Sequence, residues 1–149
     1  MPQVDPFRLR VMKAICDQIK TVTPENDYAH DLSDYVDAAG RDALRVFRGR
    51  DLFGDTDPLP MVSVLENFAA EDANDPNEME SRSQSGEFKI LIQGFAQNDH
   101  DNPLDPAYRL SADVVKALAQ AKQKDNILGF GDRLPCVTGM RIESPVHRP

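Results

Sequence analysis

Cysteine, histidine and basic charge are all scarce in this sequence. Its 149 residues include two cysteines and three histidines, and acidic side chains outnumber basic ones by 25 to 17, for a formal net charge of -8. Cys16 and Cys136 are far apart and match no metal-ligand spacing, so we expect free thiols and neither a disulfide framework nor a zinc site. The acidic balance argues against a module that binds nucleic acid by neutralising its phosphates.

Long apolar runs and catalytic motifs are missing as well. No stretch approaches the roughly 20 apolar residues of a membrane-spanning helix, and the first ten residues hold no apolar run typical of a signal peptide. We therefore expect a soluble, unexported chain with no membrane partner. P-loop, dinucleotide-binding, nucleophile-elbow and zinc-protease motifs do not occur. The absence of these motifs argues against an enzyme of those classes.

The chain has the length of one domain. Apolar residues at helical spacing predict helices over about 6–20 and 105–121, the second with Asp105 as its N-cap. Alternating side chains predict a weak strand over 28–36 as one arm of a hairpin, and then strands over 43–48, 61–68, 87–97 and 136–143. This order predicts an α+β domain in which two helices pack on one face of a mostly antiparallel sheet of four to five strands.

The other face of the predicted sheet is mixed in polarity. The alternation places Phe47, Leu91 and Phe95 on it, together with Met61 or Leu65. An apolar patch of this kind on an otherwise polar protein indicates a surface for a protein partner.

Two charged segments accompany the strands. The polar stretch at about 69–86 is an acidic insertion that we expect to be a solvated loop; its acidic residues include Glu71, Asp72, Asp75, Glu78 and Glu80. A second loop, rich in glycine and proline, joins two strands; it begins at Arg48 and Arg50 and carries Asp51, Asp55 and Asp57. Such a loop is either an ordinary turn or, in an assembling protein, a place for ion pairs between subunits.

One cluster permits a different interpretation. Asp99, His100, Asp101 and Asp105 lie within seven residues, and oxygen-rich clusters bind magnesium or calcium. The cluster lacks the glycine and the terminal glutamate of an EF-hand loop, and turn residues followed by a helix cap explain it more simply. A small metal-dependent enzyme therefore remains an alternative.

Several short motifs without catalytic residues follow one another along the chain. The first half contains LRVMKAI at 9–15, VFRGR at 46–50, FGD at 53–55 and DPLPMVSVLE at 57–66. The second half contains IQGF at 92–95, NPLDPAYRL at 102–110 with DV at 113–114, and ILG at 127–129. In this order the motifs resemble the tail terminator proteins of long-tailed bacteriophages, also called tail completion or minor tail protein U-like proteins. The resemblance makes residues 1–149 a single tail-terminator-like domain, and the insertion at 69–86 is longer than expected for the family.

The resemblance implies a structural virion protein, with no reaction and no cofactor, that works as a homohexameric ring. Such a ring caps the head-proximal end of the tail tube, stops its polymerisation and joins the tail to the neck proteins of the capsid connector. Its partners would be further copies of itself, the tail tube protein and a neck or head-completion protein. It would be assembled in the host cytoplasm and reside at the tail–neck junction of the virion, with genomic DNA passing through the ring unbound.

This role assigns tasks to the charged loops and to the apolar face. An acidic channel wall repels the phosphates of transiting DNA, so we expect the acidic side chains of 69–86, or else Asp51, Asp55 and Asp57, to face the lumen. We expect Arg48 and Arg50 to pair with acids of a neighbouring subunit, beside the apolar residues Phe47, Leu91 and Phe95. A head–tail joining or stopper protein is a further alternative, although the helix before the last predicted strand disfavours its barrel-like fold.

Overall fold

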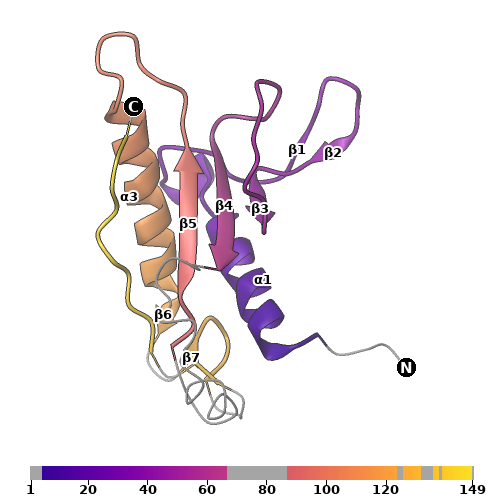
Figure 1. The fold of residues 1–149 in the computed structure, drawn as a ribbon, viewed down its shortest axis with the longest axis vertical. Helices are drawn as coiled ribbons and strands as arrows, with labels where there is room; N and C mark the ends of the chain where they lie inside the picture. The colour runs from indigo at the N-terminus through magenta and orange to yellow at the C-terminus, as the bar shows by residue number, and fades with distance from the viewer. Residues whose placement is uncertain (1–4, 67–86, 124–125, 132–135, 138, 149) are drawn as a thin grey trace.

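The structure of this chain is a computed structural model that describes residues 5–66, 87–123, 126–131, 136–137 and 139–148. Two helices and seven short strands form in these residues (Figure 1). In chain order they are α1 (Phe7–Ile19), the 3-10 turn η1 (Pro24–Asn26), β1 (Tyr35–Val36), β2 (Asp42–Ala43), β3 (Val46–Arg48), β4 (Met61–Glu66), β5 (Ile90–Phe95), α3 (Asp105–Gln120), β6 (Lys122–Gln123) and β7 (Asn126–Ile127). The α+β class predicted from the sequence is confirmed.

Both helices lie where the spacing of apolar residues predicts them, but the predicted cap of the second is wrong. The N-cap of α3 is Leu104, and Asp105 is already the first helical residue. Its carboxylate stays favourable there because it lies in the first turn, near the positive end of the helix dipole. It also approaches Arg109 one turn later, at 3.9 Å.

The main sheet has three strands in the order β3–β4–β5. β4 and β5 are antiparallel, with Ser63 opposite Gln93, whereas β3 and β4 are parallel, with Phe47 opposite Ser63. The mostly antiparallel sheet of four to five strands is therefore not found in the described residues; β1–β2 and β6–β7 are separate antiparallel pairs. The physical reason lies in segment 49–60. This segment is long enough to carry the chain back to the level at which β3 starts, as a parallel pair requires. A tight turn in its place would have produced an antiparallel hairpin.

The predicted last strand, 136–143, is also corrected. None of its described residues belongs to a strand, and the segment instead runs alongside α3 (Figure 1). Its apolar residues Val137, Met140 and Ile142 pack against the core. The strand-like alternation of apolar and polar residues therefore reflects which side chains pack on the core, without any strand pairing. Residue 138 and the end of the predicted strand 61–68 lie outside the described residues, as does the whole insertion at 69–86.

The two faces of the sheet differ in what covers them. On the first, which we call the helix-packed face, buried Val46, Val62 and Val64 join one apolar cluster with residues of α1 and α3. Gly94 lies on the same face, where a Cβ would come within 3.1 Å of the Leu110 side chain, so the helix packs directly on the strand backbone. The other face carries Phe47, Met61, Ser63, Leu91 and Phe95, and we call it the loop-covered face.

A buried polar contact fixes the chain between α1 and β1 to the second helix. The Asp113 carboxylate accepts hydrogen bonds from the backbone N–H groups of Ala29, at 3.2 Å, and His30, at 2.9 Å. It also lies 3.0 Å from Nδ1 of His30. Because all its partners are local to residues 29–30, Asp113 positions this segment, and buried Leu32 beyond it reaches the core.

Candidate functional site

Segment 49–60 folds over the loop-covered face and is held there by Arg50. The Arg50 guanidinium pairs with Asp57, with Nη2 and Oδ1 2.5 Å apart, and its Nε donates to the carbonyl of Leu52 at 3.1 Å. The other carboxylate oxygen of Asp57 accepts from the Gly54 N–H at 2.6 Å. The backbone carbonyl of Arg50 accepts from the hydroxyl of Ser63 in β4, which is fully buried. The loop is thereby fixed both to itself and to the sheet.

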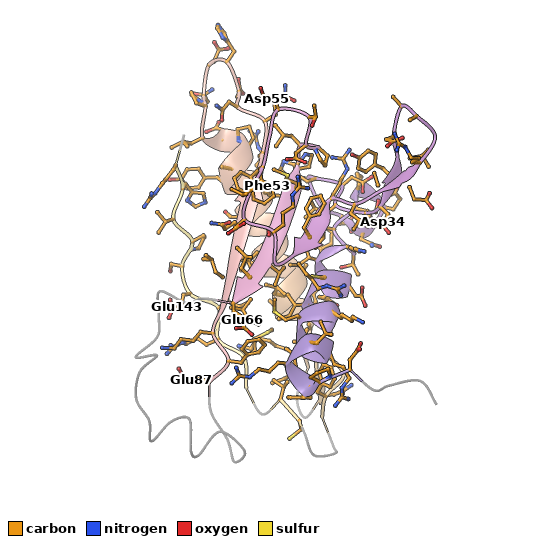
Figure 2. All side chains as sticks on the ribbon, turned by 45° about the vertical axis from the view of Figure 1, so that its right-hand side comes forward. Asp34, Phe53, Asp55, Glu66, Glu87 and Glu143 are labelled. Carbon is orange, nitrogen blue, oxygen red and sulfur yellow. The ribbon has the colours of Figure 1, made fainter. Side chains whose placement is uncertain are left out.

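Aromatic rings complete this attachment. The Arg50 guanidinium carbon lies 4.6 Å from the ring centre of Phe47 and 5.1 Å from that of Phe53. The ring of Phe53 lies 4.7 Å from that of Phe95 on β5. Figure 2 shows Phe53 over the sheet and Asp55 at the tip of the loop. Cation–π contacts of this kind are each worth about 0.5–2 kcal/mol, depending on burial.

These interactions change the apolar patch expected from the sequence. Met61 is buried, Phe47 and Phe95 are half-buried, and Leu91 remains partly exposed. The most exposed apolar side chain nearby is one that the sequence pattern did not single out, Leu52 on the loop, at 81%. A single leucine in an irregular loop carries no periodic signal, so only the structure identifies it.

The acidic residues of the loop fall into two groups. Asp51 and Asp55 are exposed, whereas Asp57 is half-buried. The N–H of Gly54 and the guanidinium of Arg50 hold the pKa of Asp57 below its usual value. Asp57 is therefore a structural group of the loop, and only Asp51 and Asp55 present free carboxylates to solvent. The expected lumen residues Glu71, Asp72, Asp75, Glu78 and Glu80 lie outside the described residues.

The two arginines expected at a subunit interface occupy different environments. Arg50 is engaged by Asp57 of its own chain. Arg48 is exposed, and within the part of the chain that the structure describes it makes no ion pair. Arg48 lines a groove of about 300 Å³ between α1 and β3. Of the two, Arg48 is the cation available to a partner.

The residues proposed for a metal site do not form one. Asp99 accepts a hydrogen bond from the backbone N–H of Asp101 at 3.0 Å, as a turn residue does, and Asp105 lies near Arg109. Across residues 5–66 and 87–123 and the shorter described segments, no three His, Cys, Asp or Glu residues lie close enough together to hold a metal ion.

The cysteines and the remaining histidine have structural surroundings. Both thiols are free, and burial raises the pKa of Cys16 to about 11, so its reactive thiolate is suppressed at neutral pH. His147 stacks on Tyr108 with ring centres 3.9 Å apart, and its Nε2 lies 2.8 Å from the Ser111 hydroxyl. These contacts attach the C-terminal segment to α3.

Comparison with known proteins does not assign this chain to a family. Neither of the described helices is long and apolar enough to span a bilayer. The chain matches no protein-family model, and a search of curated proteins finds no match to it. The candidate site therefore rests on three features of the structure: segment 49–60 held over the sheet by Arg50, the exposed Leu52, and the groove beside Arg48.

Proposed function

We propose that this protein is a structural virion protein, a tail terminator that forms a homohexameric ring at the head-proximal end of a phage tail tube. The ring stops tube polymerisation and joins the tail to the neck proteins of the capsid connector. The role includes no reaction and no cofactor. It places the protein at the tail–neck junction of the virion, after assembly in the host cytoplasm.

One observation carries the proposal beyond the motifs themselves. Residues from four family-like motifs meet in one cluster on the loop-covered face: Arg50 from VFRGR, Phe53 from FGD and Asp57 from the motif that leads into β4, all in one loop, and the distant Phe95 from IQGF. The one carboxylate of the cluster, Asp57, is occupied by Arg50 and by the Gly54 N–H. Together these contacts hold a loop that exposes Leu52 to solvent, and this arrangement favours a role in assembly over catalysis.

The charge of the chain supports the same role. Six copies at -8 each carry a formal -48, and an acidic channel repels DNA phosphates, so the genome passes without adhering. The acidic residues of 69–86, or else Asp51 and Asp55, are the candidates for the lumen. We also expect the sheet to reach four or five strands, mostly antiparallel, only when a neighbouring subunit extends it.

Mass measurement with and without tail tubes tests the function. The purified protein is expected to sediment with purified tail tubes and to be recovered from them as a hexamer by native mass spectrometry. Tubes that continue to polymerise in its presence, or protein that stays in the supernatant, would contradict the proposal. Binding to connector proteins but not to tubes would indicate the head–tail joining alternative. A thermal shift with magnesium, manganese or calcium would favour the metal-dependent enzyme.

A further inference from the structure

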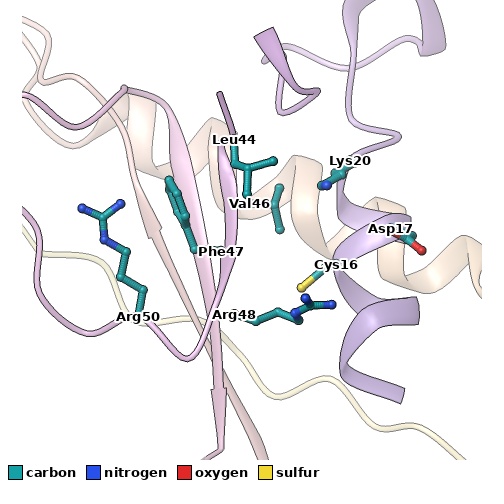
Figure 3. Close-up of a pocket in the computed structure, with 8 residues that line it drawn as sticks. All are labelled: Cys16, Asp17, Lys20, Leu44, Val46, Phe47, Arg48 and Arg50. Atoms are coloured by element: carbon teal, nitrogen blue, oxygen red, sulfur yellow. The ribbon is translucent and has the colours of Figure 1, made fainter. Parts of the chain in front are cut away.

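The groove beside β3 is cationic in a chain that is acidic as a whole. Arg48 lines it from β3, Lys20 lines it from the end of α1, and Arg50, which is paired with Asp57, lines it from the segment after β3 (Figure 3). Asp17 is the one acidic residue of its lining. Lys20 already has a partner in Asp34, at 3.3 Å, whereas Arg48 makes no ion pair or hydrogen bond among the described residues. The groove therefore favours an acidic ligand.

Apolar side chains and a free strand edge form the rest of the groove. Leu44, 44% exposed, and half-buried Phe47 supply apolar surface. The backbone bonds from Val62 to Arg45 and from Gly49 to Val64 show which groups of β3 face β4. In a parallel pair the alternate residues, Val46 and Arg48, then point their N–H and C=O groups away from β4. Within the described part of the chain nothing pairs with them, and an unpaired edge of this kind is a surface that another chain completes.

The molecule carries a surface complementary to this groove. Leu52 is 81% exposed and is flanked by the exposed carboxylates of Asp51 and Asp55. The contacts of Arg50 with Asp57 and Phe53 hold this segment in place. A prearranged loop loses little conformational entropy when it binds, so more of its contact energy appears as affinity.

We propose that the groove between α1 and β3 binds the 51–55 segment of a second copy of this chain, with Leu52 against Leu44 and Phe47 and the acids beside Arg48. This contact rests on the proposed function in one respect only, that six such contacts close a ring of six copies. It assigns Asp51 and Asp55 to subunit contact, which leaves the lumen to other acids. Direct pairing of two β3 edges is disfavoured, because it would bring the cations of both grooves together.

Disulfide trapping tests this contact even where self-association is weak. The variants Leu44→Cys and Leu52→Cys, each in a Cys16→Ala and Cys136→Ser background because Cys16 also lines the groove, are oxidised separately and as a mixture. The mixture is expected to give a 44–52 heterodimer, because only there do the two cysteines face each other across the contact. The matched control replaces Leu52→Cys with Val146→Cys, a residue 80% exposed on the C-terminal segment. Equal cross-linking in both mixtures overturns the proposal.

A charge exchange tests the polar half of the contact. Arg48→Glu in the Leu44→Cys chain is expected to slow formation of the heterodimer about tenfold or more, and Asp55→Arg in the Leu52→Cys chain is expected to restore it. Arg109→Glu, an exposed charge change on α3, is the control and should have no effect. An Arg48→Glu chain that cross-links at the original rate contradicts the assignment.

The outcome separates this inference from the proposed function. Hexamers on tail tubes without the 44–52 cross-link would remove the contact and leave the function standing. A specific cross-link in a protein that does not bind tubes would do the reverse. Circular dichroism of each variant shows whether a lost cross-link reflects a lost contact or a lost fold.

Discussion

The two faces of the three-stranded sheet are covered in different ways. On the helix-packed face, Val46, Val62 and Val64 meet apolar residues of α1 and α3 in one continuous core. On the loop-covered face, an arginine, three phenylalanines and a carboxylate fix one loop over the strands. Neighbouring residues of one strand thus enter a dry core on one side and a partly polar cluster on the other.

The difference separates stability from recognition. Burial of aliphatic side chains is non-directional and gives most of the folding free energy. Ion pairs and cation–π contacts contribute less but fix geometry, so they suit a loop that must present Leu52 in one position. We therefore expect changes on the helix-packed face to unfold the domain and changes on the loop-covered face to loosen the loop while leaving the fold intact.

The largest expected effect is on the helix-packed face. Leu110→Ala removes a side chain that is 2% exposed and that lies against the Gly94 backbone, so we expect the free energy of unfolding to fall by about 3 kcal/mol. Leu91→Ala on the opposite face, where the leucine is 38% exposed, should cost less than about 1 kcal/mol. Urea denaturation of both variants measures the contrast, and equal losses would show that the two faces do not differ in this way.

A smaller effect is expected from breaking the loop-covered face. Arg50→Ala removes the pair with Asp57 and both ring contacts, and we expect a loss of about 1–2 kcal/mol. Cleavage within 51–59 by a protease should become faster while the rest of the domain stays resistant. Arg109→Ala, on the exposed surface of α3, should change neither quantity. Cleavage at an unchanged rate in the Arg50 variant would mean that Arg50 does not hold the loop.

The smallest effect expected is a dependence on pH that belongs to the loop alone. The Gly54 N–H and the Arg50 guanidinium lower the pKa of Asp57 from its usual 3.8. Because the folded pKa lies below the unfolded one, this contribution is fully present above about pH 4 and is lost as pH falls through the folded pKa. The difference in unfolding free energy between the native chain and Asp57→Asn should therefore shrink as the pH is lowered from 6 to 3. A constant difference would contradict the pairing of the charged form.

Much of the fold follows from local sequence patterns. Apolar residues at helical spacing predict α1 and α3 to within a few residues, and alternation predicts which residues of β4 and β5 share a face. The predicted interface residues Phe47, Leu91 and Phe95 indeed share the loop-covered face. The predicted cap of α3 is wrong by one residue, since the N–H of Tyr108 already bonds to the carbonyl of Leu104. The strand at 136–143 and the mostly antiparallel sheet of four to five strands are not found in the described residues, because strand pairing depends on contacts outside the local pattern.

The sequence by itself determined the α+β class, the helices, the side-chain alternation of the main strands and the acidic balance. These depend on the period of neighbouring side chains, which the chain sets within a few residues. Only the tertiary structure decided that β3 runs parallel to β4, that Arg50 is bound to Asp57 while Arg48 is left to the groove, and that Leu52 is exposed. The physical reason is the path of segment 49–60 over the sheet. It brings together residues such as Phe53 and Phe95, whose contact cannot be predicted from the spacing of neighbouring side chains.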